Sequence, residues 1–137
     1  MTRYHNTDTP LSVRPGDLDS VGHVNNARAL EYLEHGRWDW LRKNGFSRSS
    51  DIVPVVVRLE VDYGAEIPWT EVGVETQLLE DDDAVYKATF HQRIYIGDEK
   101  KLAVQAVVHV AFIHAKNRSL CTIDDFIEGA KVACNEA

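Results

Sequence analysis

The sequence contains few of the residues that build disulfide frameworks or metal sites. Cys121 and Cys134 are its only cysteines, and they form no CxxC motif. This usage predicts two thiols in a reducing compartment and not a disulfide scaffold. None of the histidines is spaced for metal binding, with one another or with the cysteines. We therefore expect no metal and no cofactor.

Basic residues are also scarce. The chain has 15 Lys and Arg against 22 Asp and Glu, a formal net charge of -7. Because binding to phosphate backbones needs clustered Lys and Arg, we expect no nucleic-acid partner. The longest apolar-rich run, 102–113, is interrupted by Gln105 and His109 and is too short to cross a bilayer. The N-terminal residues have no apolar signal-peptide core, so we expect a cytoplasmic protein without membrane insertion.

Several enzyme signatures are missing too. The sequence has no GxSxG, GxGxxG or P-loop motif, so serine-hydrolase, dinucleotide-binding and nucleotide-binding functions have no support. With 137 residues, 44% of them hydrophobic, the chain is long enough to bury a core. We expect a single globular domain over residues 1–137.

One long amphipathic helix is predicted over residues 27–43, where apolar residues recur with helical spacing. Its core-facing side is predicted to centre on Leu30 and to include Glu34. The opposite, exposed side is predicted to hold Arg28, Glu31, His35, Asp39, Arg42 and Lys43. Asn25 or Ser20 is the candidate N-cap. Asn44 and Gly45 supply a stop signal at the other end.

Alternation of apolar and polar residues predicts strands over 53–63, 72–78, 86–96 and 102–112. The turns 81–83 and 97–98 separate the last three strands, which should form an antiparallel meander. An early strand over 10–14 and a short closing helix over 122–132 complete the pattern. The class is therefore α+β, with one helix packed on an antiparallel sheet. Apolar residues on the outer faces of the strands suggest oligomerisation.

The segment that enters the long helix is unusually polar. Asp17 and Asp19 lie there, and Asp17 is the more typical structural turn residue. Unpaired N–H groups at a helix N-terminus carry partial positive charge and can stabilise an oxyanion. A carboxylate beside them could attack a carbonyl or activate water. Asp19 is therefore either a second turn residue or a catalytic carboxylate, and Gly22 would let the backbone approach closely.

Two further residues have a structural and a functional interpretation. Glu34 is predicted on the core-facing side of the helix, where a carboxylate needs a partner or a function. It either pairs with Arg37 or helps to orient water or substrate. His23 either hydrogen-bonds the backbone of its loop or takes part in chemistry.

The stretch from Asp17 to Leu41, DLDSVGHVNNARALEYLEHGRWDWL, resembles the signature of hotdog-fold acyl-CoA thioesterases of the 4-hydroxybenzoyl-CoA thioesterase type. It is most similar to the long-chain acyl-CoA thioesterase III branch. The resemblance implies a hotdog fold, in which a curved antiparallel sheet wraps one long central helix. It also implies a homodimer or homotetramer, with active sites formed between two subunits joined edge to edge.

The resemblance also assigns roles to individual residues. Asp19 matches the catalytic carboxylate, which acts as nucleophile or as general base toward water. Asn26 matches the position whose backbone N–H points to the thioester carbonyl. Gly22 and His23 match the loop that shapes the site, and His23 also matches a histidine thought to be catalytic in plant acyl-carrier-protein thioesterases. Glu34 is left with a supporting role.

The implied function is hydrolysis of the thioester of an acyl-CoA, or of an acyl-carrier protein, to a free acid and a thiol. One alternative is a carrier-protein-specific thioesterase that releases a polyketide or fatty acid in a biosynthetic pathway. Another alternative is a hotdog module that binds acyl groups without catalysis, because fold alone does not determine function.

Overall fold

The computed structural model describes residues 4–46, 51–79 and 86–132, and in these segments six strands form one sheet. The strands are β1 (Thr7–Ser12), β2 (Ile52–Tyr63), β3 (Glu71–Leu79), β4 (Lys87–Ile96), β5 (Lys101–His114) and β6 (Leu120–Cys121). Their order is β1-β3-β4-β5-β2, and β6 pairs with β5. All pairs are antiparallel. The predicted meander of the last three long strands is confirmed.

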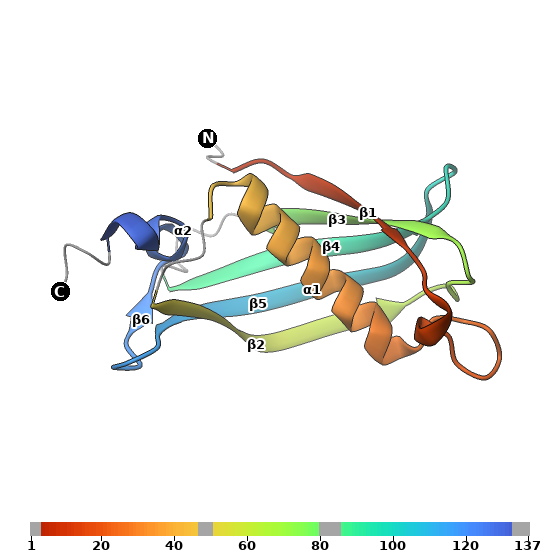
Figure 1. Cartoon of the computed structure of the whole chain (residues 1–137), viewed down its shortest axis with the longest axis horizontal. Coiled ribbons are helices and arrows are strands. Elements are labelled where there is room, and N and C mark those ends of the chain that lie inside the picture. Colours follow the sequence, from red (N-terminus) through yellow and green to blue (C-terminus); the bar gives the residue numbers. More distant parts are fainter. Residues whose placement is uncertain (1–3, 47–50, 80–85, 133–137) are drawn as a thin grey trace.

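Three helical segments accompany the sheet: η1 (Pro15–Asp17, a 3-10 turn), α1 (Asn26–Lys43) and α2 (Ile123–Val132). Figure 1 shows α1 crossing one face of the sheet diagonally, with α2 near the end of the sheet where α1 finishes. One long helix against a curved antiparallel sheet is the expected α+β hotdog arrangement.

The predicted elements match the observed ones closely, with two differences. The early strand was expected at 10–14, but β1 covers Thr7–Ser12. Its inward positions include Thr7 and Thr9, which are buried although polar, so an apolar alternation did not reveal them. The two-residue strand β6 was not predicted. The turn at 81–83 and Cys134 lie outside the described residues.

The buried face of α1 differs from the predicted one. Its buried residues are Ala29, Tyr32, Leu33, Gly36, Asp39, Trp40 and Leu41. The face is therefore centred nearer Leu33 than Leu30. Glu34, predicted on the core-facing side, is exposed, and Asp39, predicted on the exposed side, is buried. Two of the buried residues, Ala29 and Gly36, are small, and a count of large apolar side chains does not find them.

At Gly36 the backbone of α1 lies close against the sheet. A Cβ atom at this position would lie 2.6 Å from Cγ1 of Val74 and 3.1 Å from Oγ1 of Thr76, both on β3. Beside it, the fully buried amide of Gln92 on β4 donates to the carbonyl of Leu33 and to Thr76 Oγ1, both at 2.9 Å. Since each contact leaves little freedom, α1 is fixed in height and register on the sheet.

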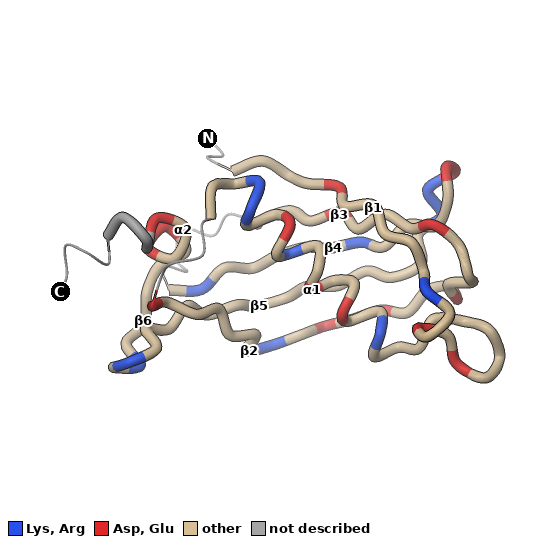
Figure 2. Tube along the Cα trace, in the orientation of Figure 1, with Lys and Arg blue, Asp and Glu red and all other residues tan. Residues whose placement is uncertain are grey.

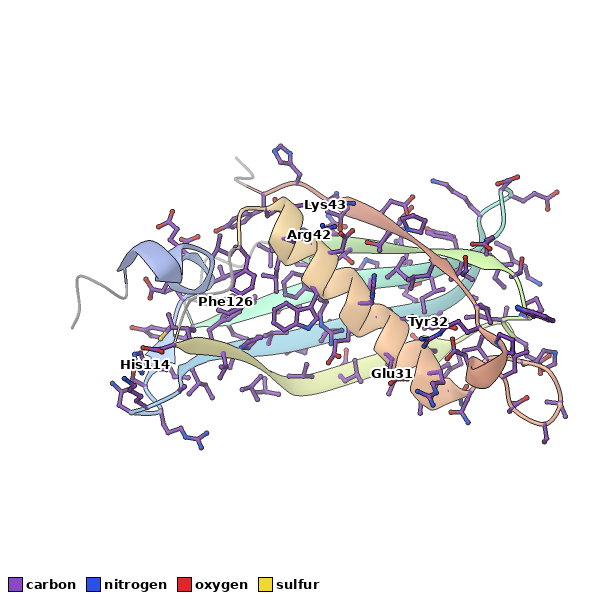
Figure 3. All side chains as sticks on the ribbon, in the orientation of Figure 1. Glu31, Tyr32, Arg42, Lys43, His114 and Phe126 are labelled. Carbon is purple, nitrogen blue, oxygen red and sulfur yellow. The ribbon has the colours of Figure 1, made fainter. Side chains whose placement is uncertain are left out.

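Asp39 ties α1 to β1. Its Oδ2 accepts a hydrogen bond from Thr9 Oγ1 at 2.6 Å, and its carboxylate lies 2.8 Å from the Arg42 guanidinium and 2.9 Å from the Lys43 ammonium. Figure 3 shows Arg42 and Lys43 at the end of α1 beside β1. Burial alone would raise the pKa of Asp39, but the hydrogen bonds from Thr9, Arg42 and Lys43 outweigh it and hold that pKa below its ordinary value.

Aromatic rings fill the end of the core under α2. Phe126 of α2 stacks on Phe46 and Phe112, at centroid distances of 4.4 and 5.0 Å. Trp40 meets Phe90 edge to face at 5.1 Å. Figure 3 shows Phe126 between α2 and the sheet. These contacts close the sheet at the end opposite the start of α1.

Gly36→Ala should destabilise the protein by about 1–3 kcal/mol, because the new methyl group overlaps Val74. The direction is informative, since alanine is otherwise the better helix former by about 1 kcal/mol. Urea unfolding followed by circular dichroism measures the change. His35→Ala, at the exposed neighbouring position, should change stability little. A Gly36→Ala variant as stable as the wild type would contradict the close contact.

The carboxylate of Asp39 should make the free energy of unfolding depend on pH in the acidic range. Because its folded-state pKa lies below the unfolded value, its contribution is present above the unfolded pKa and is lost as the pH falls through the folded pKa. The free energy of unfolding should therefore decrease from about pH 5 downward, and less steeply in Asp39→Asn. Asp98→Asn, an exposed turn position, is the control. Equal slopes in wild type and Asp39→Asn would contradict this assignment.

Candidate active site

The segment between η1 and α1 folds back on itself as a short ladder. Asn25 N–H donates to the carbonyl of Asp17 at 2.9 Å, and Asp19 N–H donates to the carbonyl of His23 at 2.7 Å. An isolated β-bridge between residues 18 and 24 lies between these two bonds. Gly22 closes the turn at φ +86°, in the left-handed region that favours glycine. Figure 1 shows this loop projecting beyond the start of α1.

The carboxylate of Asp19 is held by the tip of this loop. Its Oδ1 accepts hydrogen bonds from the backbone N–H groups of Val21 at 3.0 Å and His23 at 3.1 Å. The residue is exposed, and within the described segments its Oδ2 has no hydrogen-bond donor. One oxygen therefore orients the carboxylate, while the other remains available for chemistry.

The N-terminus of α1 directly follows the ladder. The Asn25 side chain accepts from Ala27 N–H at 2.8 Å, so Asn25 is the N-cap, one of the two predicted candidates. The backbone N–H of Asn26 donates to no acceptor within the described residues. A first-turn amide without a partner carries the partial positive charge of the helix end. It can donate to an oxygen that develops negative charge.

His23 faces a residue that the sequence did not single out. Its ring Nε2 lies 3.3 Å from Oε2 of Glu66, a contact that becomes an ion pair when the imidazole is protonated. Glu66 lies in the connection between β2 and β3, and Val24 N–H donates to the carbonyl of Ile67 in the same connection at 2.8 Å. No local spacing links the two segments, so only the fold brings them together.

Asp17, expected to be structural, is buried beside the ladder. Tyr32 Oη donates to its Oδ2 at 2.5 Å, and the Arg14 guanidinium lies 3.2 Å from its Oδ1. Burial by itself would raise the pKa of Asp17, but the hydrogen bonds from Tyr32 and Arg14 outweigh it and lower that pKa. Burial, followed by the hydrogen bond to Asp17, raises the pKa of Tyr32. Tyr32 was not predicted as a site residue.

Glu34 does not join Asp19. It lies eight residues into α1 from Asn26, about 12 Å along the helix axis. The ion pair with Arg37, one of the two alternatives for Glu34, is not among the contacts of the described residues; the Arg37 guanidinium donates instead to Gln92 Oε1 at 3.0 Å. Burial lowers the pKa of Arg37. Both residues border a small, mostly apolar cavity, whose lining is Glu34, Arg37, Trp38, Leu41, Pro54, Val56, Phe90, Val110 and Phe112.

Charged residues are dispersed over the described segments. Figure 2 shows Lys and Arg interspersed with Asp and Glu along the trace of the described residues. Among the described residues, no group of three or more His, Cys, Asp or Glu side chains is placed to hold a metal ion. None of the described helices combines the length and the apolarity needed to cross a bilayer.

Comparison with known proteins decides the family. The model of the thioesterase-like superfamily matches residues 13–130. The chain belongs to this superfamily. The expected enzyme class, thioester hydrolase, is thereby confirmed at the level of the family. The match includes the ladder, α1 and the five strands that follow the helix.

Individual relatives agree with this placement. The long-chain acyl-CoA thioesterase FadM of Escherichia coli K12 is 41% identical over 58 residues, which are 40% of this chain and 44% of FadM. The match thus spans less than half of that relative. The YbaW probable thioesterase from Escherichia coli has a TM-score of 0.70 at 25% identity, over 90% of this chain and 95% of its own.

A third relative supports the hotdog fold at greater sequence distance. The DHNA-CoA thioesterase from Staphylococcus aureus has a TM-score of 0.79 over 96% of this chain and 89% of its own. Its sequence identity is only 19%, so the similarity concerns the fold.

Proposed function

We propose that this protein hydrolyses acyl-CoA thioesters to a free acid and CoA, with Asp19 as the catalytic carboxylate. One observation carries the proposal: two backbone amides orient the Asp19 carboxylate in a ladder that leads into the unpaired Asn26 N–H. An exposed carboxylate close to a helix N-terminus supplies both a base or nucleophile and an oxyanion donor.

Thioester hydrolysis needs only these two groups, a carboxylate and an oxyanion donor. A thioester is already activated, because its sulfur conjugates poorly with the carbonyl. The carbonyl oxygen would accept from the Asn26 N–H, which stabilises the oxyanion of the tetrahedral intermediate. One such donor is typically worth about 3–4 kcal/mol. The Asn26 N–H lies at the N-terminus of α1, so the helix dipole adds to the stabilisation of negative charge on the carbonyl oxygen.

Asp19 can act in either of two ways. As a general base it takes a proton from water, the hydroxide attacks the carbonyl carbon, and the thiolate leaves and is protonated. As a nucleophile it attacks the carbonyl itself, expels the thiolate and forms an acyl anhydride that water then hydrolyses. Both routes give one acid and one thiol per water consumed. His23, beside Glu66, shapes the loop and is a candidate for the proton transfer to the leaving thiolate.

The acyl-CoA substrate class rests on the relatives, which are named for acyl-CoA substrates in two cases. A carrier-protein substrate offers the same thioester to the same groups. Rates on matched acyl-CoA and acyl-carrier-protein substrates distinguish the two. A thiol-release assay over a panel of acyl-CoAs also tests the acyl-binding alternative, which predicts binding without turnover.

We also propose that two copies join along the free edge of β2. This strand ends the sheet, so its outer edge has no partner within the described residues. It carries an exposed apolar row that a lone protomer would leave in water. The row consists of Val53, Val55, Val56, Val57 and Leu59. Tyr63, at the end of the same strand, donates to the carbonyl of Asn26 at 3.2 Å, so this edge reaches the candidate site.

Asp19→Asn should lower kcat by about 10²–10⁴-fold, because the amide can neither accept a proton nor attack. The fold should remain intact, since an asparagine oxygen still accepts from Val21 and His23. Thiol release from acyl-CoA measures the rate, and circular dichroism checks the fold. Asp98→Asn is the matched control, with unchanged turnover. Full activity in Asp19→Asn would refute the assignment.

Val57→Asp should shift the protein toward the monomer, since it places a charge in the apolar row of β2. Light scattering after size exclusion measures the mass. Leu120→Asp, which changes a similarly exposed apolar residue on β6, should leave the mass unchanged. If Val57→Asp keeps the wild-type mass, the β2 edge is not the interface.

A further inference from the structure

Asp17 ties the ladder that holds Asp19 both to the N-cap of α1 and to the second turn of that helix. Its main-chain carbonyl accepts from Asn25 N–H at the N-cap, and its side chain accepts from Tyr32 Oη at 2.5 Å. Tyr32 lies in the second turn of α1, so the two attachments are separated along the helix. Figure 3 shows Tyr32 extending from α1 toward the segment that contains η1.

The ladder is also tied to the connection between β2 and β3, where Val24 N–H donates to the carbonyl of Ile67. The bond from Tyr32 adds a tie to the second turn of α1 and so limits rotation of the ladder relative to the helix. This bond is well protected, since Asp17 is 2% exposed and Tyr32 is 6% exposed. The Asp17 carboxylate is further held by Arg14, and Arg28 Nε lies 4.0 Å away. The negative charge of Asp17 is therefore compensated by neighbouring guanidinium groups although the carboxylate is buried.

We propose that Asp17 and Tyr32 are positioning residues that fix the Asp19 carboxylate relative to the Asn26 N–H. Asp19 lies two residues beyond Asp17, in the same ladder, and the Asn26 amide begins the helix that carries Tyr32. The bond between Asp17 and Tyr32 thus links the two halves of the site without touching a substrate. This inference rests on the proposed function, in which those two groups act on one carbonyl.

Tyr32→Phe tests the inference, because it removes the hydroxyl and keeps the buried ring. We expect kcat to fall by up to about 10²-fold, the effect of a misplaced catalytic group. KM should change little, since Asp17 and Tyr32 are both buried and we expect neither to contact the substrate. Asp17→Asn tests the same bond from its other end: it keeps an oxygen for Tyr32 but loses the charge that binds Arg14, and should lower kcat less.

The matched control is Thr9→Val. Like Tyr32→Phe, it removes one buried hydroxyl that donates to a buried carboxylate. In this case Thr9 Oγ1 donates to Asp39 of α1 at 2.6 Å. This bond lies at the C-terminal end of α1, away from the ladder. Thr9→Val should lower the urea midpoint as Tyr32→Phe does and leave kcat at the wild-type value. Equal losses of kcat in both variants, or none in either, would overturn the positioning role.

Hydrogen exchange supplies a readout that does not depend on activity. The amides of Val21 and His23, which donate to Asp19, should exchange faster in Tyr32→Phe and at the wild-type rate in Thr9→Val. Unchanged exchange in Tyr32→Phe would overturn the inference. A wild-type protein without thioester hydrolysis, but with faster exchange in Tyr32→Phe, would instead overturn the proposed function alone.

Discussion

The contact between α1 and the sheet at Gly36 determines where the rest of the molecule lies. A side chain there would overlap Val74, so only glycine lets the helix rest directly on β3. The buried amide of Gln92 then fixes the register through the carbonyl of Leu33. Because both constraints act near the middle of α1, they place its two ends at once. Asp39 secures one end to β1, and the other end carries the candidate site.

At the N-terminal end of α1, the ladder places the groups of the candidate site relative to the helix. Two main-chain hydrogen bonds, one on each side of the β-bridge between residues 18 and 24, join residues 17–19 to residues 23–25. The tip holds the Asp19 carboxylate, and the base leads into the Asn26 amide. Buried polar groups are costly unless they are bonded, so the saturated surroundings of Asp17 resist rearrangement. In our proposal the exposed carboxylate of Asp19 is the catalytic one, and the buried carboxylate of Asp17 positions it.

Much of the fold was predictable because strands and helices leave periodic apolar patterns in the sequence. The meander, α1 and α2 follow those patterns. The errors concern polar or small residues inside the protein: Thr9 in β1, Gly36 and Asp39 in α1. Each is buried because it hydrogen-bonds or closely contacts a residue of another helix or strand. No helical wheel contains that information, which is why Glu34 was assigned to the wrong side.

The candidate site was only partly predictable for the same reason. The roles of Asp19 and the Asn26 amide come from the resemblance of a local motif to a known family, and they stay predictions that the physics of a helix N-terminus makes reasonable. The partners of the loop come from elsewhere in the chain. Tyr32 meets Asp17, and Glu66 meets His23, across separations that no local spacing marks.

The central claim is that the Asn26 amide and the Asp19 carboxylate act on the same thioester carbonyl. A crystal structure with a ketone analogue of acyl-CoA, in which a methylene replaces the sulfur, tests it most directly. The account predicts the ketone oxygen about 2.7–3.1 Å from the Asn26 nitrogen. The Asp19 carboxylate should then lie beside the carbonyl carbon, directly or through one water. A ketone bound away from both groups would contradict the account.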